Sequence, residues 1–210
     1  MKRGLFISFE GIDGCGKSTQ LLKLVKYLFD VDKYNHCFLT REPYKDRDIR
    51  KILQADNNTY DSGEKLAELF VNDRKEHIEK LIIPKLKQGI HVITDRYSFS
   101  TLAYQQTQGV DLNKLLKMHK GLIIPDIIFI IDVPSKIAVE RIKKDKNERA
   151  KKHKFEKNPG FLEKLRKIYL DLSNLKNHNV IVIDGTKNPD EIFEQQIKPA
   201  FDKLYQASFS

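Results

Sequence analysis

A glycine-rich segment between an apolar run and a helical pattern places the strongest constraint on how this chain folds. Residues 11–18 read GIDGCGKS and match the phosphate-loop pattern G-x-x-x-x-G-K-[ST] at every fixed position. Residues 5–9 (LFISF) predict a buried strand before the segment, and the leucine spacing between Leu21 and Leu28 predicts a helix after it. A strand, a glycine turn and a helix N-terminus form a cradle for phosphate groups. The sequence therefore predicts a nucleoside triphosphate site rather than a chance glycine turn.

Each residue type in this loop has a physical reason to be there. Glycines adopt backbone angles closed to other residues and let the chain approach a ligand closely. Lys17 adds a full positive charge, and the Ser18 hydroxyl is a ligand for Mg²⁺, the cofactor expected with ATP. The residues predicted to bind ATP in this segment are Gly11, Ile12, Asp13, Gly14, Cys15, Gly16, Lys17, Ser18 and Thr19.

Length and composition favour one domain that spans residues 1–210. The chain is 40% hydrophobic, which suffices for one substantial core, and no apolar run approaches the length of about 18 residues that a membrane span needs. The N-terminus enters the first predicted strand at once, which leaves no room for a signal peptide. Cys15 and Cys37 lack metal or C-x-x-C spacing and predict free thiols. We expect a cytoplasmic protein without a membrane partner.

The net charge of +9 is concentrated in one short segment. Residues 143–157 hold eight Lys or Arg and three Asp or Glu, which is five of the nine net positive charges. A surface that follows a polynucleotide backbone is normally broader and interleaved with aromatic residues. The distribution therefore favours a small polyanion over nucleic acid as the partner.

Short apolar runs alternate with helical patterns along the chain. Continuous rather than alternating hydrophobicity indicates strands that are buried on both faces of a parallel sheet. Further strands are predicted at 36–40, 90–94, 127–133 and 180–183, and further helices at 62–88 (bent by Pro84), 158–174 and 189–205. The predicted fold is α/β, a three-layer P-loop NTPase fold with a five-stranded parallel sheet, helices on both faces and a basic lid segment at about 143–157.

Charged residues follow several of these strands, where open parallel sheets bind their ligands. Arg41 follows the second strand, and Asp95 and Arg96 follow the third. Asp95 suits a magnesium-bound water, and Arg96 suits bidentate binding of a phosphate. Singly, such residues are often helix caps or solvated charges. Together, two arginines facing a triphosphate site suggest a second phosphorylated substrate, and therefore phosphoryl transfer between nucleotides.

The chain resembles the thymidylate kinase family of nucleoside monophosphate kinases over nearly its whole length. The resemblance is carried by FEGIDGCGKSTQ (9–20), TREP (40–43), LFVNDR (69–74), DRYSFSTLAYQ (95–105), Pro125-Asp126 and the segment from Phe155-Glu156 to Tyr169-Leu170. The phosphate loop is shared by countless NTPases, whereas the stretch at 95–105 combined with Arg41-Glu42-Pro43 is far more specific.

The resemblance implies roles for residues of the acceptor site. Asp13 would accept a hydrogen bond from the 3′-hydroxyl of the acceptor deoxyribose, and Arg41 and Arg96 would hold its phosphate. Tyr104 would lie beneath the sugar and favour deoxyribose. The base would be contacted by Phe70 through stacking, by Arg74 through a hydrogen bond to a carbonyl, and by Thr101 and Gln105. Ser100 is assigned to the same acceptor site and Arg141 to the ATP site.

In this family the segment 143–157 corresponds to a mobile lid over ATP, and a catalytic arginine comes either from the phosphate loop or from the lid. Gly14 and Cys15 supply no arginine, so the lid must provide the cation. The chain departs from many lid-type members by having His153-Lys154 before Phe155. The candidates are Arg149, Lys151, Lys152 and Lys154, of which Arg149 is preferred because lysine lacks the planar fork of arginine.

The expected activity is transfer of the ATP γ-phosphoryl group to dTMP by a homodimeric thymidylate kinase, with Lys17, Arg96, Asp95 and Arg149 as catalytic residues and Ser18 and Asp95 at Mg²⁺. A kinase for dUMP, dGMP or an unphosphorylated nucleoside is the nearest alternative. A GTPase-type switch would need Asn-Lys-x-Asp, whereas Asn113-Lys114 is followed by two leucines. A nucleic-acid-binding ATPase is a third alternative, and it draws only on the net charge.

Overall fold

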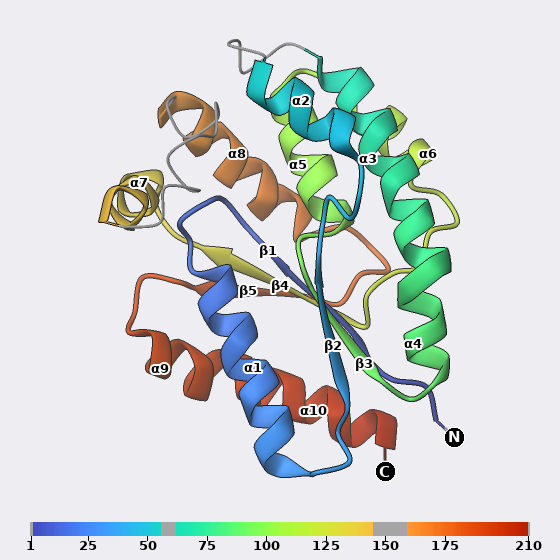
Figure 1. Ribbon diagram of the computed structural model, residues 1–210. Coiled ribbons are helices and arrows are strands. Elements are labelled where there is room, and N and C mark those ends of the chain that lie inside the picture. Colours follow the sequence, from blue (N-terminus) through green and yellow to red (C-terminus); the bar gives the residue numbers. More distant parts are fainter. Residues whose placement is uncertain (1, 56–61, 145–158, 210) are drawn as a thin grey trace.

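A five-stranded parallel sheet forms the centre of the molecule in the computed structural model, which describes residues 2–55, 62–144 and 159–209. The strand order is β2-β3-β1-β4-β5, and all four pairings are parallel (Figure 1). The strands are β1 (Phe6–Glu10), β2 (Cys37–Arg41), β3 (His91–Asp95), β4 (Ile127–Asp132) and β5 (Val180–Asp184). This arrangement confirms the predicted α/β fold.

The predicted strand positions agree with the structure to within one residue at each end. β1, β3 and the first five residues of β4 are buried along their whole length, as expected for strands that are covered on both faces. β2 and β5 lie at the two edges of the sheet and are only partly buried. The strand order reverses beside β1: β3 and β2 lie on one side of it, and β4 and β5 lie on the other. Such a switch point is where open α/β sheets bind ligands.

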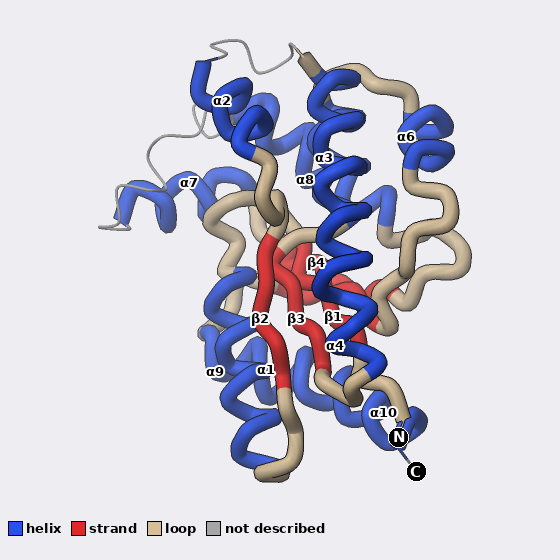
Figure 2. Tube along the Cα trace, turned by 45° about the vertical axis from the view of Figure 1, so that its right-hand side comes forward, coloured by secondary structure: helices blue, strands red, loops and turns tan. Residues whose placement is uncertain are grey.

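Helices cover both faces of the sheet (Figures 1 and 2). One layer contains α1 (Lys17–Val31), α9 (Pro189–Ile192) and α10 (Lys198–Phe209). The other contains α3 (Gly63–His77), α4 (Ile83–Lys87), α5 (Ser98–Thr107) and α8 (Pro159–Leu172). Three further helices lie around the carboxyl ends of the strands. They are α2 (Arg47–Ala55), α6 (Leu112–Met118) and α7 (Ser135–Lys144).

Two predicted long helices are each interrupted by a π-helical turn. The pattern at 62–88 contains α3, a π turn at Ile78–Ile82 and α4. The interruption lies next to Pro84, which has no N–H to continue the α-helical bonding. The pattern at 189–205 contains α9, a π turn at Phe193–Ile197 and α10, and it continues to Phe209. None of the helices among the described residues is both long enough and apolar enough to cross a membrane.

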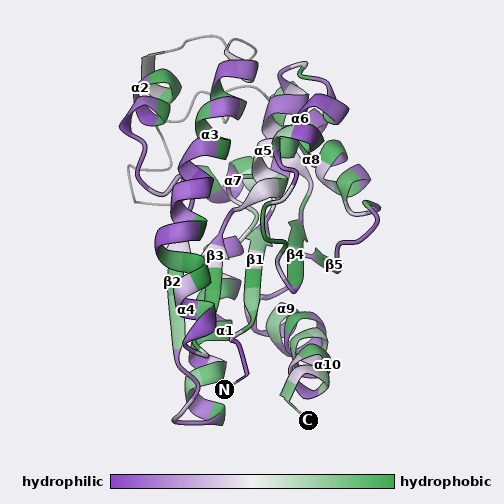
Figure 3. Cartoon of the chain, turned by 90° about the vertical axis from the view of Figure 1, so that its right-hand side faces the viewer, coloured by the Kyte–Doolittle hydropathy of each residue, from purple (hydrophilic) through white to green (hydrophobic). Residues whose placement is uncertain are grey.

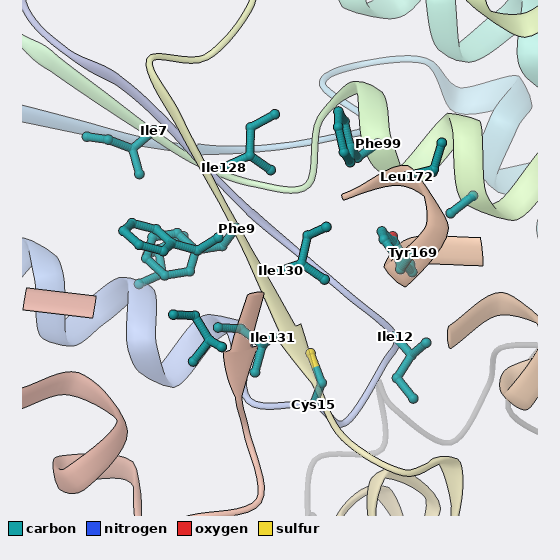
Figure 4. Close-up of a cluster of buried hydrophobic side chains, with 14 of the residues drawn as sticks. Ile7, Phe9, Ile12, Cys15, Phe99, Ile128, Ile130, Ile131, Tyr169 and Leu172 are labelled. Atoms are coloured by element: carbon teal, nitrogen blue, oxygen red, sulfur yellow. The ribbon is translucent and has the colours of Figure 1, made fainter. Parts of the chain in front are cut away.

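The main hydrophobic core lies on both sides of β1 and β4 and includes the phosphate loop. Phe9 and Phe129 pack with ring centroids 5.2 Å apart, and Ile130 and Ile131 continue the apolar surface of β4 (Figure 4). Cys15 is buried at the edge of this cluster. The green strands and inward helix faces in Figure 3 show the same pattern, because polar residues face outward. The loop after β1 is therefore anchored to the core through Ile12 and Cys15.

Candidate active site

The phosphate loop joins the end of β1 to the first turn of α1. Gly11 has φ 132°, and a Cβ there would lie 2.6 Å from the carbonyl oxygen of Ile131. Gly14 has φ 78°, and its missing Cβ leaves room for the carbonyl of Ala138 on α7. Both positions therefore require glycine. Lys17 is buried, and its Nζ donates to the carbonyl oxygens of Gly11 (3.0 Å) and Ile12 (2.9 Å), which holds the ammonium group inside the loop.

Three predicted site residues meet beside the loop: Ser18 from the loop itself, and Asp95 and Arg41 from strand ends. The Ser18 hydroxyl donates to Asp95 Oδ2 at 3.2 Å, and Arg41 Nε donates to the same oxygen at 3.0 Å. Arg41 is largely exposed, with 67% of its side chain accessible, so its guanidinium group is open to solvent. These three residues also line a pocket of about 310 Å³ whose other walls are Leu21, Leu22, Leu39 and Thr40.

The groups beside the loop fit a magnesium ion. Asp95 Oδ1 is buried and has no hydrogen-bond partner among the described residues, so one carboxylate oxygen is left for another ligand. A hydroxyl and a carboxylate are the oxygen donors that Mg²⁺ prefers, and it usually completes its shell with substrate phosphates and water. In the part of the chain that the structure describes, no group of three or more His, Cys, Asp or Glu side chains forms a metal cage.

Arg96 lies across the mouth of the phosphate loop in a left-handed backbone conformation (φ 74°). Its Nη2 donates to Asp13 Oδ1 at 2.6 Å and to the Tyr104 hydroxyl at 3.3 Å. Its Nη1 donates to the Gly11 carbonyl at 3.1 Å and to the Ser100 hydroxyl at 3.0 Å. The structure therefore brings five predicted site residues, from the loop, the end of β3 and α5, into one cluster. Non-glycine residues rarely take positive φ, and such strain is concentrated at functional sites.

Glu10 supports this cluster from below, and sequence reasoning did not assign it a role. It has no exposed surface. Its Oε1 accepts from the backbone N–H of Tyr97 at 2.8 Å, and its Oε2 accepts from the Ser100 hydroxyl at 2.6 Å. Burial raises the pKa of Glu10 to about 7, against the opposing effects of Ser100 and the Arg96 charge. A charged residue that ends an otherwise apolar strand was the signal available for it in the sequence.

Arg74, predicted to contact the base, is buried in a polar network between α3 and α5. Its Nε donates to Glu42 Oε2 at 2.8 Å, and its Nη2 donates to the Thr101 hydroxyl at 3.0 Å. Its Nη1 lies 2.8 Å from Nε2 of His119. The other oxygen of Glu42 lies 3.2 Å from Nδ1 of His77. Arg74 and Thr101, both predicted to contact the base, therefore lie together, whereas Glu42, His77 and His119 were not assigned to the site.

Two further residues predicted for the base pocket lie close to this network along the chain. Phe70 is half-buried on α3, one turn before Arg74. Gln105 is buried on α5, one turn after Thr101, and its Nε2 donates to Gln108 Oε1 at 3.0 Å. Its Oε1 has no hydrogen-bond partner among the described residues. A buried acceptor of this kind is normally satisfied, so it is a candidate contact for a ligand donor.

Arg141 and Thr19 are the other residues predicted for the ATP site, and the predicted lid adjoins it. Arg141, on α7, donates to the carbonyl oxygens of Cys15 (3.3 Å) and Gly185 (2.9 Å), so it lies against the phosphate loop. Thr19 is exposed in the first turn of α1. The lid prediction lies mostly outside the described residues, which include only Lys143 and Lys144 at the end of α7. Arg149, Lys151, Lys152 and Lys154 all fall outside them.

The residues that the sequence did not indicate share one property. Each of them contacts other side chains of the protein. Glu42 belongs to the stretch TREP, in which only Arg41 carries a sequence signal for phosphate binding. Tyr169 lies in α8, and its hydroxyl is 2.9 Å from that of Ser100. His119 caps the end of α6, where a lone histidine carries no sequence signal. Their partners come from distant segments, so only the folded chain reveals these contacts.

Comparison with known proteins agrees with this geometry. The sequence model of the thymidylate kinase family matches residues 9–197. A thymidylate kinase of Thermosipho africanus is 41% identical over 210 residues, covering 97% of this chain and 100% of that protein. One of Geobacillus sp. is 34% identical, covering 96% and 98%. A probable thymidylate kinase of Pyrococcus horikoshii is 39% identical over 180 residues, covering 82% and 84%.

These matches extend over the phosphate loop, the arginines at the ends of β2 and β3, and the buried network around Arg74. A match over most of the chain at this level of identity, together with a parallel sheet that carries the loop at its switch point, leaves one assignment. The chain belongs to the thymidylate kinase family.

Proposed function

We propose that this enzyme transfers the γ-phosphoryl group of ATP to dTMP and releases ADP and dTDP. The observation that carries the proposal is the position of Arg96, whose guanidinium group lies within hydrogen-bond distance of both the Gly11 carbonyl and Asp13. This places a positive charge at the edge of the phosphate loop. An acceptor phosphate would meet the end of a bound triphosphate at this point. The kinases named in the comparisons support the choice of dTMP as acceptor.

On the donor side, the loop amides and Lys17 would bind the β- and γ-phosphates. Lys17 Nζ is held by loop carbonyls, so its charge is already positioned in the cradle. Ser18 would bind Mg²⁺ directly and Asp95 through water, and the unpartnered Asp95 Oδ1 supports this assignment. Bound Mg²⁺ supplies positive charge that offsets the negative charge on the transferred group. Arg141 would border the nucleotide, since it contacts both the loop and Gly185.

On the acceptor side, Arg41 and Arg96 would hold the phosphate of dTMP, assisted by Ser100. Arg41 reaches solvent next to Asp95, so its guanidinium group is accessible to a phosphate. Asp13 and Tyr104 would contact the deoxyribose, and the hydrogen bond between them at 3.1 Å supports a shared role. The base would lie among Phe70, Arg74, Thr101 and Gln105.

The reaction needs no covalent intermediate with the protein. The enzyme would hold the two nucleotides in line and neutralise charge on the transferred phosphoryl group, which are the main contributions to phosphoryl transfer. Arg149 is proposed as the lid residue that adds charge at this point. Closure over the site would exclude water and so protect ATP from hydrolysis.

The same proposal includes a cytoplasmic homodimer that binds neither nucleic acid nor membranes. The uneven charge, with five of nine net positive charges in residues 143–157, supports a small anionic ligand over a polynucleotide. Light scattering on the purified protein would test the dimer, and a nucleic-acid binding assay at low salt would test the absence of that affinity.

An acceptor panel tests the proposed reaction directly. ATP and Mg²⁺ would be supplied with dTMP, dUMP, dGMP or thymidine, and ADP release would be measured. We expect dTMP to give the highest kcat/KM and thymidine, which lacks the phosphate, to give none. Lys17→Ala should lower kcat by about 100-fold or more while circular dichroism shows a folded protein. Preference for thymidine over dTMP, or near-normal turnover by Lys17→Ala, would contradict the proposal.

A further inference from the structure

His119 holds one end of the Arg74 guanidinium group in a way that fixes the protonation of its own ring. Its Nδ1 lies 2.7 Å from the carbonyl oxygen of Leu115, one turn earlier on α6. A carbonyl can only accept, so Nδ1 must carry the hydrogen. Its Nε2 lies 2.8 Å from Arg74 Nη1, which can only donate. The imidazole is therefore neutral and presents a lone pair to Arg74.

The other end of the same guanidinium group is held by different residues. Nε donates to Glu42 Oε2, and Nη2 lies 2.6 Å from the same oxygen and donates to Thr101. Within the described part of the chain, Nη1 of Arg74 has His119 as its hydrogen-bond acceptor. An arginine has two N–H groups on Nη1, so one of them is left for a ligand acceptor. The direction of that N–H is set by the bond that the first one makes to His119.

We propose that His119 is a positioning residue for base recognition, because as a neutral acceptor it orients the free N–H of Arg74 toward a carbonyl oxygen of the pyrimidine. This inference rests on the proposed function, in which Arg74 contacts the base. Thymine and uracil carry a carbonyl at position 4, whereas cytosine carries an amino group there. A fixed N–H donor can bond the carbonyl of thymine or uracil, whereas it would face the N–H donors of the cytosine amino group. The orientation of Arg74 therefore contributes to selectivity for thymine and uracil over cytosine.

The charge state of His119 agrees with this geometry. Burial and the Arg74 charge lower the pKa of His119 to about 4. Arg74 itself lies over the Tyr97 ring, with its central carbon 4.9 Å from the ring centroid, so the plane of the guanidinium group is also restrained. The ring, the carboxylate of Glu42 and the imidazole together allow the group little rotation.

The test compares His119→Leu with His119→Gln. Leucine has no acceptor, whereas glutamine places an oxygen close to the position of Nε2. For His119→Leu we expect KM for dTMP and for dUMP to rise together by about tenfold, in line with one charge-assisted hydrogen bond. The inhibition constant of dCMP, KM for ATP and kcat should stay within about twofold. His119→Gln should restore most of the affinity for dTMP.

Lys117→Leu is the matched control, since Lys117 is exposed on the same helix and is not part of the network. Thermal unfolding of each variant shows whether it is folded. Unchanged KM for dTMP in His119→Leu would overturn the inference. Equal weakening of dCMP and dTMP, a parallel rise in KM for ATP, or an equal loss in His119→Gln would show a structural role only and would also overturn it. Failure of the proposed function is distinct, because the parent enzyme would then phosphorylate no dTMP.

Discussion

Glu10 is a carboxyl group without exposed surface, and the charged residues around it explain why the chain tolerates it. Arg96 and Arg74 supply positive charge, and the hydroxyl of Ser100 and the N–H of Tyr97 donate hydrogen bonds. These favourable contacts do not fully offset desolvation, which is why the pKa of Glu10 is raised to about 7. The benefit is local, since Glu10 fixes the backbone immediately after Arg96 and so stabilises its left-handed conformation.

The raised pKa predicts how stability depends on pH. The unfolded chain releases the Glu10 proton near pH 4.5 and the folded chain near pH 7, so stability falls as pH rises through this window. The shift corresponds to about 3 kcal/mol that is fully lost above pH 7. Glu10→Gln removes this dependence. Urea unfolding of both proteins at pH 5 and pH 8 should show the parent losing more stability than the variant by about that amount.

The parent must be compared with Glu10→Gln because other groups change the stability with pH in the opposite direction to Glu10. The lowered pKa of His119 makes the folded chain release a proton that the unfolded chain retains, so its contribution to stability is lost as pH falls below about 6.5. Taking the difference between Glu10→Gln and the parent cancels this effect. Parallel pH profiles for the two proteins would contradict the prediction. The same result would mean that the folded chain already ionises Glu10 near its ordinary pKa.

At the scale of elements, one aspartate connects the segment after β2 to helix α3. Asp73 is buried on α3 and accepts hydrogen bonds from three consecutive backbone N–H groups, those of Tyr44 (2.5 Å), Lys45 (2.8 Å) and Asp46 (2.9 Å). The segment that it holds begins directly after Arg41 and Glu42. The position of both side chains therefore depends on a contact between two elements rather than on the strand alone.

Asp73→Ala should weaken both stability and acceptor binding. It leaves three partly buried N–H groups without their charged acceptor, which should cost about 2 to 3 kcal/mol in the free energy of unfolding. KM for dTMP should rise more than KM for ATP, because the segment held by Asp73 follows closely after Arg41 and Glu42. Glu68→Ala is the control, since Glu68 is exposed on the same helix. A variant as stable as this control would show that water replaces the carboxylate without cost.

The strands and the site residues differ in how far the sequence predicts them. A strand that is buried on both faces must be apolar, so its hydrophobic run marks it to within a residue, as at β3. The loop follows from glycine and lysine spacing alone. The π turns at Ile78–Ile82 and Phe193–Ile197 do not follow, because a single extra residue per turn hardly changes the apolar pattern. Arg74 was predicted, but its partners come from three other segments that only the fold brings together.

At the scale of the molecule, the two predicted ligand sites share one edge of the sheet. The phosphate loop follows β1, Arg41 is the last residue of β2, and Arg96 directly follows β3. Asp95 connects them, because one of its oxygens contacts both Ser18 on the proposed donor side and Arg41 on the proposed acceptor side. Phosphoryl transfer between two bound nucleotides requires this continuity, whereas a hydrolase or a nucleotide switch requires only the first site.

A ligand that spans both sites should therefore bind far more tightly than either nucleotide. Adenosine and thymidine joined through a chain with as many phosphates as ATP and dTMP together would occupy both sites, and the second contact would form at an effective concentration in the millimolar range. We expect its dissociation constant, measured by calorimetry, to lie at least about 100-fold below that of dTMP. A diadenosine compound of the same length and a thymidine compound with a shorter chain are the controls. Affinity no better than that of these controls would show that the two sites do not meet end to end, because a linked ligand gains only where both ends can be bound at once.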